Sequence, residues 1–568
     1  MNHLSKLKLL LTAAAALGAT LAPSDARACG GFFCSQSAPV NQAAERIIFA
    51  DNGDGTVTAV IQIMYEGPAE NFSWLLPISS VPQDGQIGVA SNLAFSRLQA
   101  ATNPQYNLTT RVEGNCKETR GDNDSAGPGF PGSAAGGASG GGPTSPPGVM
   151  VEAQGVVGAF DYIVISVDPE LRDPEDAAVN WLTENGYDVS PGSPALLRPY
   201  LADEDMYLLA LRLTKGSDVG SIRPISLTYE ASKPMIPIKL TAVAANDDMG
   251  VMTWLLSDAR GVPENYLSLE LNEARINWFN AGATYNEVVI AAADDAGGQG
   301  FVTEFAGPAT ALNQVVWTSF DEQQWETFRT TSFGSLDQLF SSSVSSWSAY
   351  DGFWDAVRTT VTLPDGVVLQ DVQACPSCFR GYQFSPSAYL AELESQVIAP
   401  VRQVQELIDA HPYVTRLYTT MSAAEMTLDP AFTFNPSLDG VSNIHNAERI
   451  IECSPAVELS DAPWRIELPQ GGVVRGTASD VGTWPSAVAD QPANFRVLQL
   501  SASGPGQVRE DNAGRIQGML DDYNQGVPRP RSSGGCAISA PAGGGLGAVA
   551  LAGLAAAGVL ARRRRTPR

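Results

Sequence analysis

The stretch AERIIFA-DNGDG-TVTAVIQIMY, residues 44–65, decides the fold of this chain. Two runs rich in apolar and β-branched residues flank the segment 51–55, whose Asn-Gly and Asp-Gly pairs favour a tight turn. The pattern predicts a β-hairpin with strands over 44–50 and 56–65. The acidic turn does not match a calcium-binding loop, because Gly53 and Gly55 stand where oxygen ligands are required.

Motifs on both sides of this hairpin resemble a known family. The Cys29-Gly-Gly-Phe-Phe-Cys34 start, the Ile61-Gln-Ile-x-Tyr-x-Gly67 strand and the Phe72-Ser-Trp-Leu-Leu-Pro77 segment are similar to the bacterial family called domain of unknown function 2330. The likeness resumes at residues 181–187, 223–229 and 234–240. It covers about the first half of the mature chain and implies a fold and a location, but no chemistry.

The first half of the chain reads as a mostly antiparallel β domain, residues 29–257, with one inserted helix. The helix is expected to begin at Asp173-Pro174 and to close at Gly186. Residues 121–148 are packed with Gly, Ser, Pro and Ala, which predicts a flexible loop. Further strands are expected over residues 156–167, 206–214, 222–229, 236–244 and 251–257.

The second half mixes helices and strands, which gives an α+β fold class for the whole chain. Residues 258–370 are expected to form a mixed region, with a strand over 285–293 and helices over 321–329, 335–340 and 350–357. Its tryptophans could line a groove for glycans, but we favour a buried core, because each Trp can bury a large area. They are Trp317, Trp325, Trp347 and Trp354.

The last folded region is predicted over residues 371–524, and its main element is a long helix over 386–410. Ser385 caps this helix, an apolar stripe follows at helical spacing, and Pro400 should kink it. A final helix is expected over 509–524. Residues 525–535 read as a stalk rich in Pro, Gly and Ser.

The N-terminal 28 residues have the pattern of a signal peptide. Lys6 and Lys8 precede an apolar run over 9–21, and Ala26-Arg27-Ala28 is a small-x-small cleavage site. Cleavage there would leave Cys29 as the first residue. A lipoprotein reading of Cys29 stays open, although Ala26 stands where a lipoprotein signal usually has Leu.

The C-terminal residues 536–568 combine Cys536, an apolar run over 543–561 and four arginines over 562–565. The run is just long enough to span a bilayer, and the arginines should stay cytoplasmic. This order resembles the MYXO-CTERM sorting tail. The resemblance implies a lipid on Cys536, partner machinery that attaches it, a protease that removes the helix, and display at the cell surface. The alternative is an ordinary inner-membrane anchor.

The net charge of the mature chain limits which kinds of molecule can bind to it. Between Cys29 and Gly535 there are 27 basic and 60 acidic residues, a net charge of −33, against −26 for the whole chain. Nucleic acid is therefore excluded as a partner on electrostatic grounds. Such a surface is soluble and could collect divalent cations, but no spacing predicts a metal site. Candidate acidic pairs are Asp247-Asp248, Asp294-Asp295 and Asp521-Asp522.

Six cysteines besides Cys536 are candidates for disulfides in an oxidising compartment. Close spacing favours the pairs Cys29–Cys34 and Cys375–Cys378, which leaves Cys116 for Cys453. The CxxC motif at 375–378 could instead exchange thiols, or bind zinc together with Cys29 and Cys34. We favour a structural bridge.

Catalytic signals are weak. After signal cleavage only His411 and His445 remain, and no motif supports a catalytic or zinc-binding role for either. No catalytic residue and no cofactor is predicted. The sequence therefore favours an exported, cell-surface-anchored binding or structural protein. The alternative is an exported enzyme, either a thiol–disulfide oxidoreductase that uses the CxxC motif or a hydrolase that uses paired carboxylates.

Overall fold

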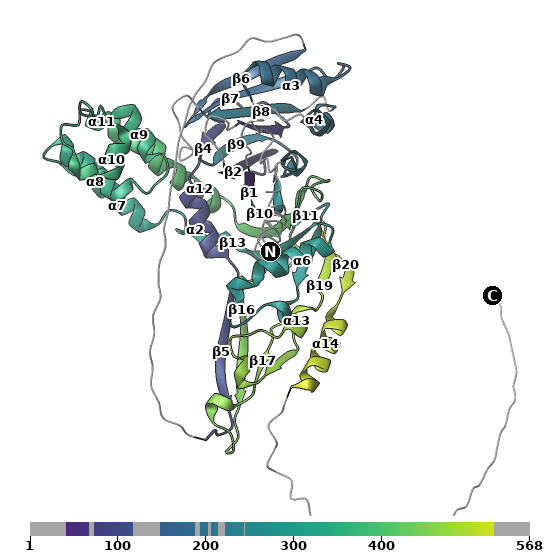
Figure 1. Ribbon diagram of the computed structural model, residues 1–568. Coiled ribbons are helices and arrows are strands. Elements are labelled where there is room, and N and C mark those ends of the chain that lie inside the picture. Colours follow the sequence, from purple (N-terminus) through teal and green to yellow (C-terminus); the bar gives the residue numbers. More distant parts are fainter. Residues whose placement is uncertain are drawn as a thin grey trace, which may run out of the picture. The chain divides into compact units, whose positions relative to one another are not determined.

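The computed structural model describes residues 41–66, 73–117, 148–187, 193–202, 206–213, 222–243 and 245–527. The expected signal peptide, Cys29, Cys34, nearly all of the Gly-rich loop, most of the stalk and the C-terminal tail lie outside these ranges. The α+β fold class is confirmed, with large antiparallel-rich sheets early in the chain and many helices later (Figure 1).

Twenty strands are assigned in the described ranges: β1 Asn41–Asp51, β2 Thr56–Glu66, β3 Ser73–Ile78, β4 Ile87–Val89, β5 Gln105–Glu113, β6 Val149–Val157, β7 Phe160–Val167, β8 Tyr207–Leu213, β9 Ile225–Glu230, β10 Ala245–Ser257, β11 Arg260–Pro263, β12 Leu267–Leu271, β13 Gly300–Pro308, β14 Tyr413–Met421, β15 Phe432–Asn435, β16 Ile444–Glu452, β17 Trp464–Glu467, β18 Val473–Gly476, β19 Asn494–Gln499 and β20 Gln507–Asp511.

The α-helices of the same ranges are α2 Asn92–Thr102, α3 Pro174–Glu184, α4 Ser193–Leu201, α5 Ile238–Thr241, α6 Tyr285–Asp295, α7 Ser319–Thr330, α8 Leu336–Trp347, α9 Phe353–Thr360, α10 Leu369–Ala374, α11 Pro386–Leu393, α12 Ala399–Asp409, α13 Ser486–Ala489 and α14 Ala513–Gly526.

The predicted hairpin is confirmed and lies within a ten-stranded sheet. Strands β1 and β2 pair antiparallel, with the turn at residues 52–55 between them. The sheet order is β20-β19-β12-β13-β14-β10-β1-β2-β9-β4, and β1 pairs with β10 in parallel. The sheet thus takes strands from all three regions that the sequence suggested, and all described residues belong to one compact unit.

The hairpin buries both of its faces. Ile47, Phe49 and Ile61 pack with a second, four-stranded sheet of order β3-β8-β7-β6. Ile48 and Val60 point to the opposite face and join the core of α2 and of helices α7–α12. Helices α3 and α4 cover the far side of the smaller sheet. The result is four layers, helix–sheet–sheet–helix.

The helical region holds the tryptophans in its core. Trp325 and Trp347 are fully buried and Trp317 nearly so, whereas Trp354 is partly exposed at the margin. Trp325 and Trp347 meet edge to face with ring centroids 5.6 Å apart. Burial of this cluster, predicted from the sequence, is therefore confirmed for three of the four residues. Figure 1 shows α7–α11 gathered in one group.

The long helix spans residues 386–409 in three continuous segments. Helix α11 begins after Ser385, whose Oγ accepts the Ala388 N–H. A π-helical turn over Glu394–Ile398 separates α11 from α12, directly before Pro400. A proline has no N–H to give to the preceding turn, so the wider turn takes up the mismatch. The sequence predicts a kink at Pro400, and the structure has a π-helical turn just before that residue.

Four expected elements are wrong or displaced. Residues 156–167 are not one strand, because a turn at residues 158–159 separates the end of β6 from its antiparallel partner β7. Residues 285–293 form helix α6 instead of a strand, because Val288, Val289 and Ala292 bury one helical face. Residues 236–244 hold the short helix α5 instead of a strand. The expected helix over 509–524 begins only at Ala513, after strand β20. The Asp173 side chain makes no capping bond to α3, although that helix begins at Pro174 as expected.

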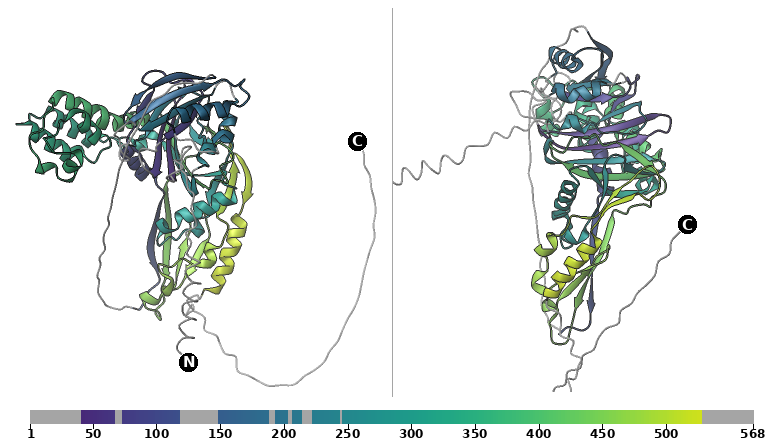
Figure 2. Two further views of the ribbon diagram at one scale, coloured as in Figure 1. Left: turned by 45° about the horizontal axis from the view of Figure 1, so that its top comes forward. Right: turned by 90° about the vertical axis from the view of Figure 1, so that its right-hand side faces the viewer.

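Another four-stranded sheet, which we call the arm, joins the two halves of the chain. Its order is β18-β17-β16-β5, and β5 runs parallel to β16 over nine register pairs (Figure 2). A disulfide links Cys116, just after β5, to Cys453, just after β16. The added Cβ of a non-glycine residue at Gly114 would lie 2.5 Å from the Cys453 carbonyl oxygen, so the two segments are closely apposed here.

We predict that the double substitution Cys116→Ser, Cys453→Ser lowers the free energy of unfolding by about 2–5 kcal/mol. The bridge closes a loop of 337 residues, so its loss frees the unfolded chain more than the folded one. Urea unfolding of the oxidised protein and of the variant measures the difference. The variant Cys375→Ser, Cys378→Ser is the control, because its loop spans three residues; an equal loss in both variants would contradict the prediction.

Candidate functional site

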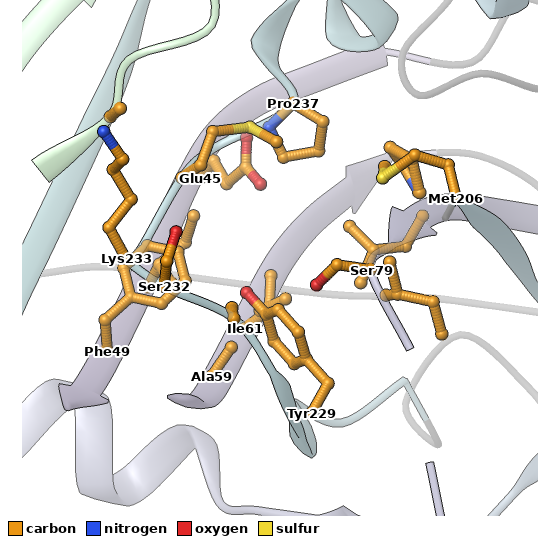
Figure 3. Close-up of a pocket in the computed structure, with 17 residues that line it drawn as sticks. Glu45, Phe49, Ala59, Ile61, Ser79, Met206, Tyr229, Ser232, Lys233 and Pro237 are labelled. Atoms are coloured by element: carbon orange, nitrogen blue, oxygen red, sulfur yellow. The ribbon is translucent and has the colours of Figure 1, made fainter. Parts of the chain in front are cut away.

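A cavity of about 270 Å³ lies between the ten-stranded sheet and the sheet of order β3-β8-β7-β6. Its walls come from β1, β2 and β3, from the start of β8 and from the segment that follows β9. Most lining side chains are apolar, among them Phe49, Ala59 and Ile61. Figure 3 shows these side chains around the open space.

Glu45 brings a carboxyl group into this apolar space. It is two residues before Ile47 on β1, so strand alternation places it on the same face as Ile47 and Phe49. The residue is 5% exposed, and its Oε2 has no hydrogen-bond partner among the described residues. Burial raises the pKa of the Glu45 carboxyl to about 7. A buried carboxyl without a partner is costly and is therefore uncommon in a folded protein.

The other polar groups around the cavity are already engaged or stay neutral. Lys233 Nζ lies 2.5 Å from Glu264 Oε2, and Ser79 Oγ donates to the Glu230 carbonyl oxygen at 2.5 Å. Burial raises the pKa of the Tyr229 phenol well above its ordinary range, so this group stays protonated. Among the described residues, Glu45 is thus the charged group of this cavity with an oxygen, Oε2, that lacks a partner.

The arrangement suits binding better than catalysis. An apolar cavity with one oriented polar group is the usual form of a small-molecule site. The described residues that line it include neither histidine nor cysteine, so the common pairs of a nucleophile and its base are not found among them.

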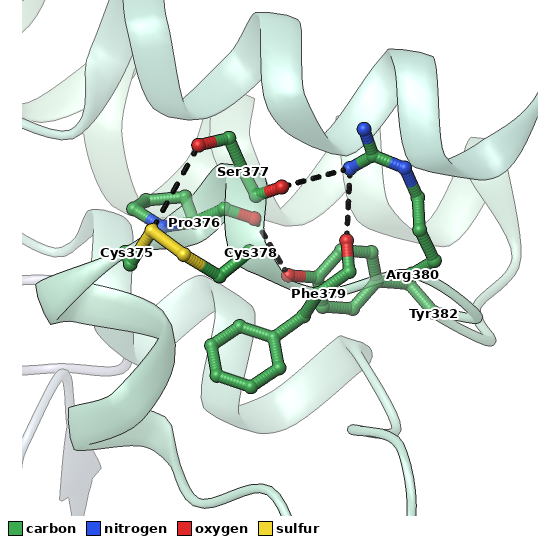
Figure 4. The surroundings of a disulfide bond; sticks show 7 residues. All are labelled: Cys375, Pro376, Ser377, Cys378, Phe379, Arg380 and Tyr382. Carbon is green, nitrogen blue, oxygen red and sulfur yellow. Dashed lines mark hydrogen bonds between the residues drawn. A yellow bond between two sulfur atoms is a disulfide. The ribbon is translucent and has the colours of Figure 1, made fainter.

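The CxxC motif is a disulfide at the surface. Cys375 and Cys378 are bonded to each other in a short turn that follows α10 (Figure 4). The Cys375 N–H donates to the Asp371 carbonyl oxygen, so the motif lies at the carboxyl end of that helix. Reactive cysteines favour the amino end, where the helix dipole stabilises a thiolate. The geometry therefore agrees better with a structural bridge than with thiol exchange.

The remaining candidates are separated in the fold or lie outside the described ranges. Cys29, Cys34 and Cys536 fall outside. Within the described ranges no group of three or more His, Cys, Asp and Glu side chains could hold a metal ion. None of the helices in those ranges is both long and apolar enough to cross a bilayer; the run 543–561 is not among them.

Sequence reasoning missed Glu45. A signal was present, because Glu45 is the one acidic residue in the strand segment AERIIFA. Glu45 is two residues before Ile47 and four before Phe49, so all three point to the same face of the strand. That face is buried together with the opposite one only if the strand is covered on both sides. Nothing in the local pattern says which strands are covered twice.

The fold and the cavity define an α+β protein with two face-packed sheets and a ligand-sized space between them. The chain belongs to the family described as "Uncharacterized protein conserved in bacteria (DUF2330)", whose model matches residues 23–330. Of the described residues that line the cavity, only Ala431 lies beyond that match.

Comparison with solved structures found a likeness to two crystal structures of a mutated baculovirus P35 after caspase cleavage. Both are 13% identical, with a TM-score of 0.22. The matches cover 38% and 43% of this chain and 67% and 69% of those chains. At this TM-score the likeness supports no inference. No curated protein matches the chain.

We predict that stability falls with rising pH in a manner that depends on Glu45. The folded-state pKa of Glu45 is raised from 4.5 to about 7, so the folded state holds more protons than the unfolded state between these values. The free energy of unfolding therefore decreases as pH rises through this window, by about 3 kcal/mol for this group.

Urea unfolding of wild type and Glu45→Gln at several pH values tests this prediction. The wild type should lose stability relative to the variant as pH rises from about 4.5 to about 7 and level off above that range. Glu184→Gln is the control, because Glu184 is exposed on α3. A constant difference between wild type and Glu45→Gln across the window would contradict the raised pKa.

Proposed function

We propose that this protein is exported, is anchored at the cell surface, and binds a small, mainly apolar amine in the cavity between its two sheets. The observation that carries the binding part is Oε2 of Glu45, which is buried at an apolar cavity and has no hydrogen-bond partner among the described residues. A ligand that brings a positive group to this oxygen would supply the missing complement.

The electrostatics favour an amine over an acid or an alcohol. With its pKa of about 7, Glu45 is ionised in part at neutral pH, and an ammonium group would stabilise the ionised form. A carboxylate ligand would be repelled by the ionised form. The amine of Lys233 does not fill this role, because it pairs with Glu264.

The apolar walls set the rest of the ligand. Phe49, Ala59 and Ile61 offer no hydrogen bond from their side chains, so the body of the ligand should be a hydrocarbon. Burying each methylene of that body contributes about 0.8 kcal/mol. A volume of about 270 Å³ suits a short alkyl or a single aromatic group.

We predict that hexylamine binds more tightly than hexanol, and that hexanoate binds least. Isothermal titration calorimetry at about pH 8 measures all three. Glu45→Gln should weaken hexylamine binding about tenfold and leave hexanol nearly unchanged, since only the charge is lost. Ala59→Leu fills the cavity and should weaken both. Equal binding of hexylamine by wild type and Glu45→Gln would rule out the proposed role of Glu45.

The location rests on the two ends of the chain. Lys6, Lys8, the apolar run over 9–21 and the Ala26-x-Ala28 site support export. The order of Cys536, an apolar helix rich in Gly and Ala, and four arginines supports surface display through a lipid on Cys536. Sorting machinery that cleaves the helix and attaches the lipid is part of this proposal.

We predict that Cys536→Ala releases or misplaces the protein without unfolding it. A lipid on Cys536 would hold the protein at the membrane, whereas residues 525–535 carry no apolar stripe that the folded core needs. Cell fractionation of wild type and variant measures the location, and circular dichroism of both checks the fold. If the variant fractionates with the outer surface like wild type, the run 543–561 is a plain membrane anchor instead.

A further inference from the structure

We propose that a second cavity of this protein is an esterase-type hydrolytic site, in which His445 acts as general base and Glu273 orients its imidazole. The cavity has a volume of about 350 Å³ and lies where strands β12 and β13 of the large sheet meet β5 and β16 of the arm. Among the residues that the structure describes, it shares no lining residue with the Glu45 cavity. The inference does not depend on amine binding.

The imidazole of His445 is held from two sides. Its Nδ1 lies 2.6 Å from Glu273 Oε1. On the neighbouring strand Tyr106 is its direct register partner, and the two rings stack with centroids 4.5 Å apart and planes 14° from parallel. These contacts fix both the plane of the ring and its rotation.

The pairing with a carboxylate also fixes the tautomer. Because the carboxylate accepts, Nδ1 carries the proton, and the lone pair of the neutral ring is on Nε2. No hydrogen bond joins Nε2 to any residue in the described ranges, and the side chain is 24% exposed. Nε2 is thus the nitrogen available to take a proton.

Glu273 is itself rigidly placed. It begins the short 3₁₀ helix Glu273–Arg275, directly after β12, and Asn272 caps that helix. The Glu273 N–H donates to Gln470 Oε1 at 3.1 Å, and Trp278 Nε1 donates to the Glu273 carbonyl oxygen at 3.0 Å. Its side chain is 7% exposed. These contacts hold the backbone of Glu273 in place; its carboxylate meets His445 through Oε1, while Oε2 is buried without a hydrogen-bond partner among the described residues. A carboxylate on a fixed backbone and in a buried site can hold the imidazole in one orientation.

The other histidine, His411, has a ring whose two nitrogens are both occupied by backbone contacts. His411 Nδ1 lies 2.8 Å from the Leu407 carbonyl oxygen, and its Nε2 lies 3.1 Å from the Asp51 carbonyl oxygen. Both nitrogens face the backbone. His411 is therefore a structural residue and provides a matched control.

Further groups of the cavity suit a hydrolytic reaction. Arg260 lines it and brings a positive charge, with Nη2 3.3 Å from Thr303 Oγ1. Glu304 also lines it, but is neutralised by Arg416 and accepts the Tyr285 hydroxyl at 2.5 Å. Burial, together with the charges of Glu273 and Glu304, raises the pKa of Tyr106 well above its ordinary range, so its phenol stays neutral.

The reaction needs only water and an ester. His445 Nε2 takes a proton from water as the hydroxide oxygen bonds to the acyl carbon, and the carbonyl electron pair moves to its oxygen. The tetrahedral intermediate collapses, the bond to the alcohol oxygen breaks, and Nε2 returns the proton to that oxygen. The products are an acid and an alcohol, and nothing is oxidised or reduced.

The test uses p-nitrophenyl acetate with the full folded chain. His445→Ala should lower kcat about 100-fold, whereas His411→Gln should leave it unchanged. Glu273→Gln should lower kcat with little change in KM, because it misorients the base without touching the substrate. Added imidazole should restore activity to His445→Ala above the rate of free imidazole, an effect that a structural role would not give.

Circular dichroism and urea unfolding establish that each variant is folded, and His445→Gln replaces His445→Ala if the latter is not. A lower kcat in deuterium oxide is expected, because a proton moves in the chemical step. Equal rates for wild type and a folded His445 variant would overturn the proposal. So would a wild-type rate no higher than that of free imidazole at the same concentration.

Discussion

The centre of the structure depends on the contacts of one buried group, the guanidinium of Arg416. Its side chain is 2% exposed and forms an ion pair with Glu304 across a distance of 2.6 Å. Nη1 also donates to the Gln99 carbonyl oxygen and to Thr102 Oγ1, and the group lies over the Trp254 ring. One charged group thereby connects β14 to β13, α2 and β10.

A buried charge of this kind is costly unless every partner is in place. Here the partners come from residues far apart in the sequence, so the cost is met only when the whole arrangement forms. Removing one member of a buried ion pair typically costs about 3–5 kcal/mol, because the other is left uncompensated. The contacts of Arg416 therefore favour one packing of α2 on the sheet over any slipped alternative.

Local patterns in the sequence predict those parts of the fold that local physics controls. The hairpin follows from its turn chemistry, and the long helix follows from its Ser385 cap and apolar stripe. Burial of Trp325 and Trp347 follows from side-chain size. The strand expected over residues 285–293 is wrong. Val and Ile favour strands locally, whereas packing of Val288, Val289 and Ala292 against the sheet favours a helix.

The sites could not be found in the same way, because they depend on non-local contacts. Glu45 is unusual only because a second sheet covers its strand. His445 gains its partner Glu273 from a segment 172 residues earlier in the chain. Spacing motifs detect neither case, since they record what lies close along the chain. The family match does contain Glu45 and Glu273, but not His445.

The position of β14 shows that the segment matched by the family model is shorter than the segment needed to complete the large sheet. The family match ends at residue 330, yet β14 lies between β13 and β10, near the middle of the large sheet. A segment that stopped at the family boundary would carry β10 and β13 as two open edges, with the place between them vacant. Open edges of this kind invite pairing with other chains. During synthesis the first half must therefore wait for residues beyond 413 before its central sheet can close.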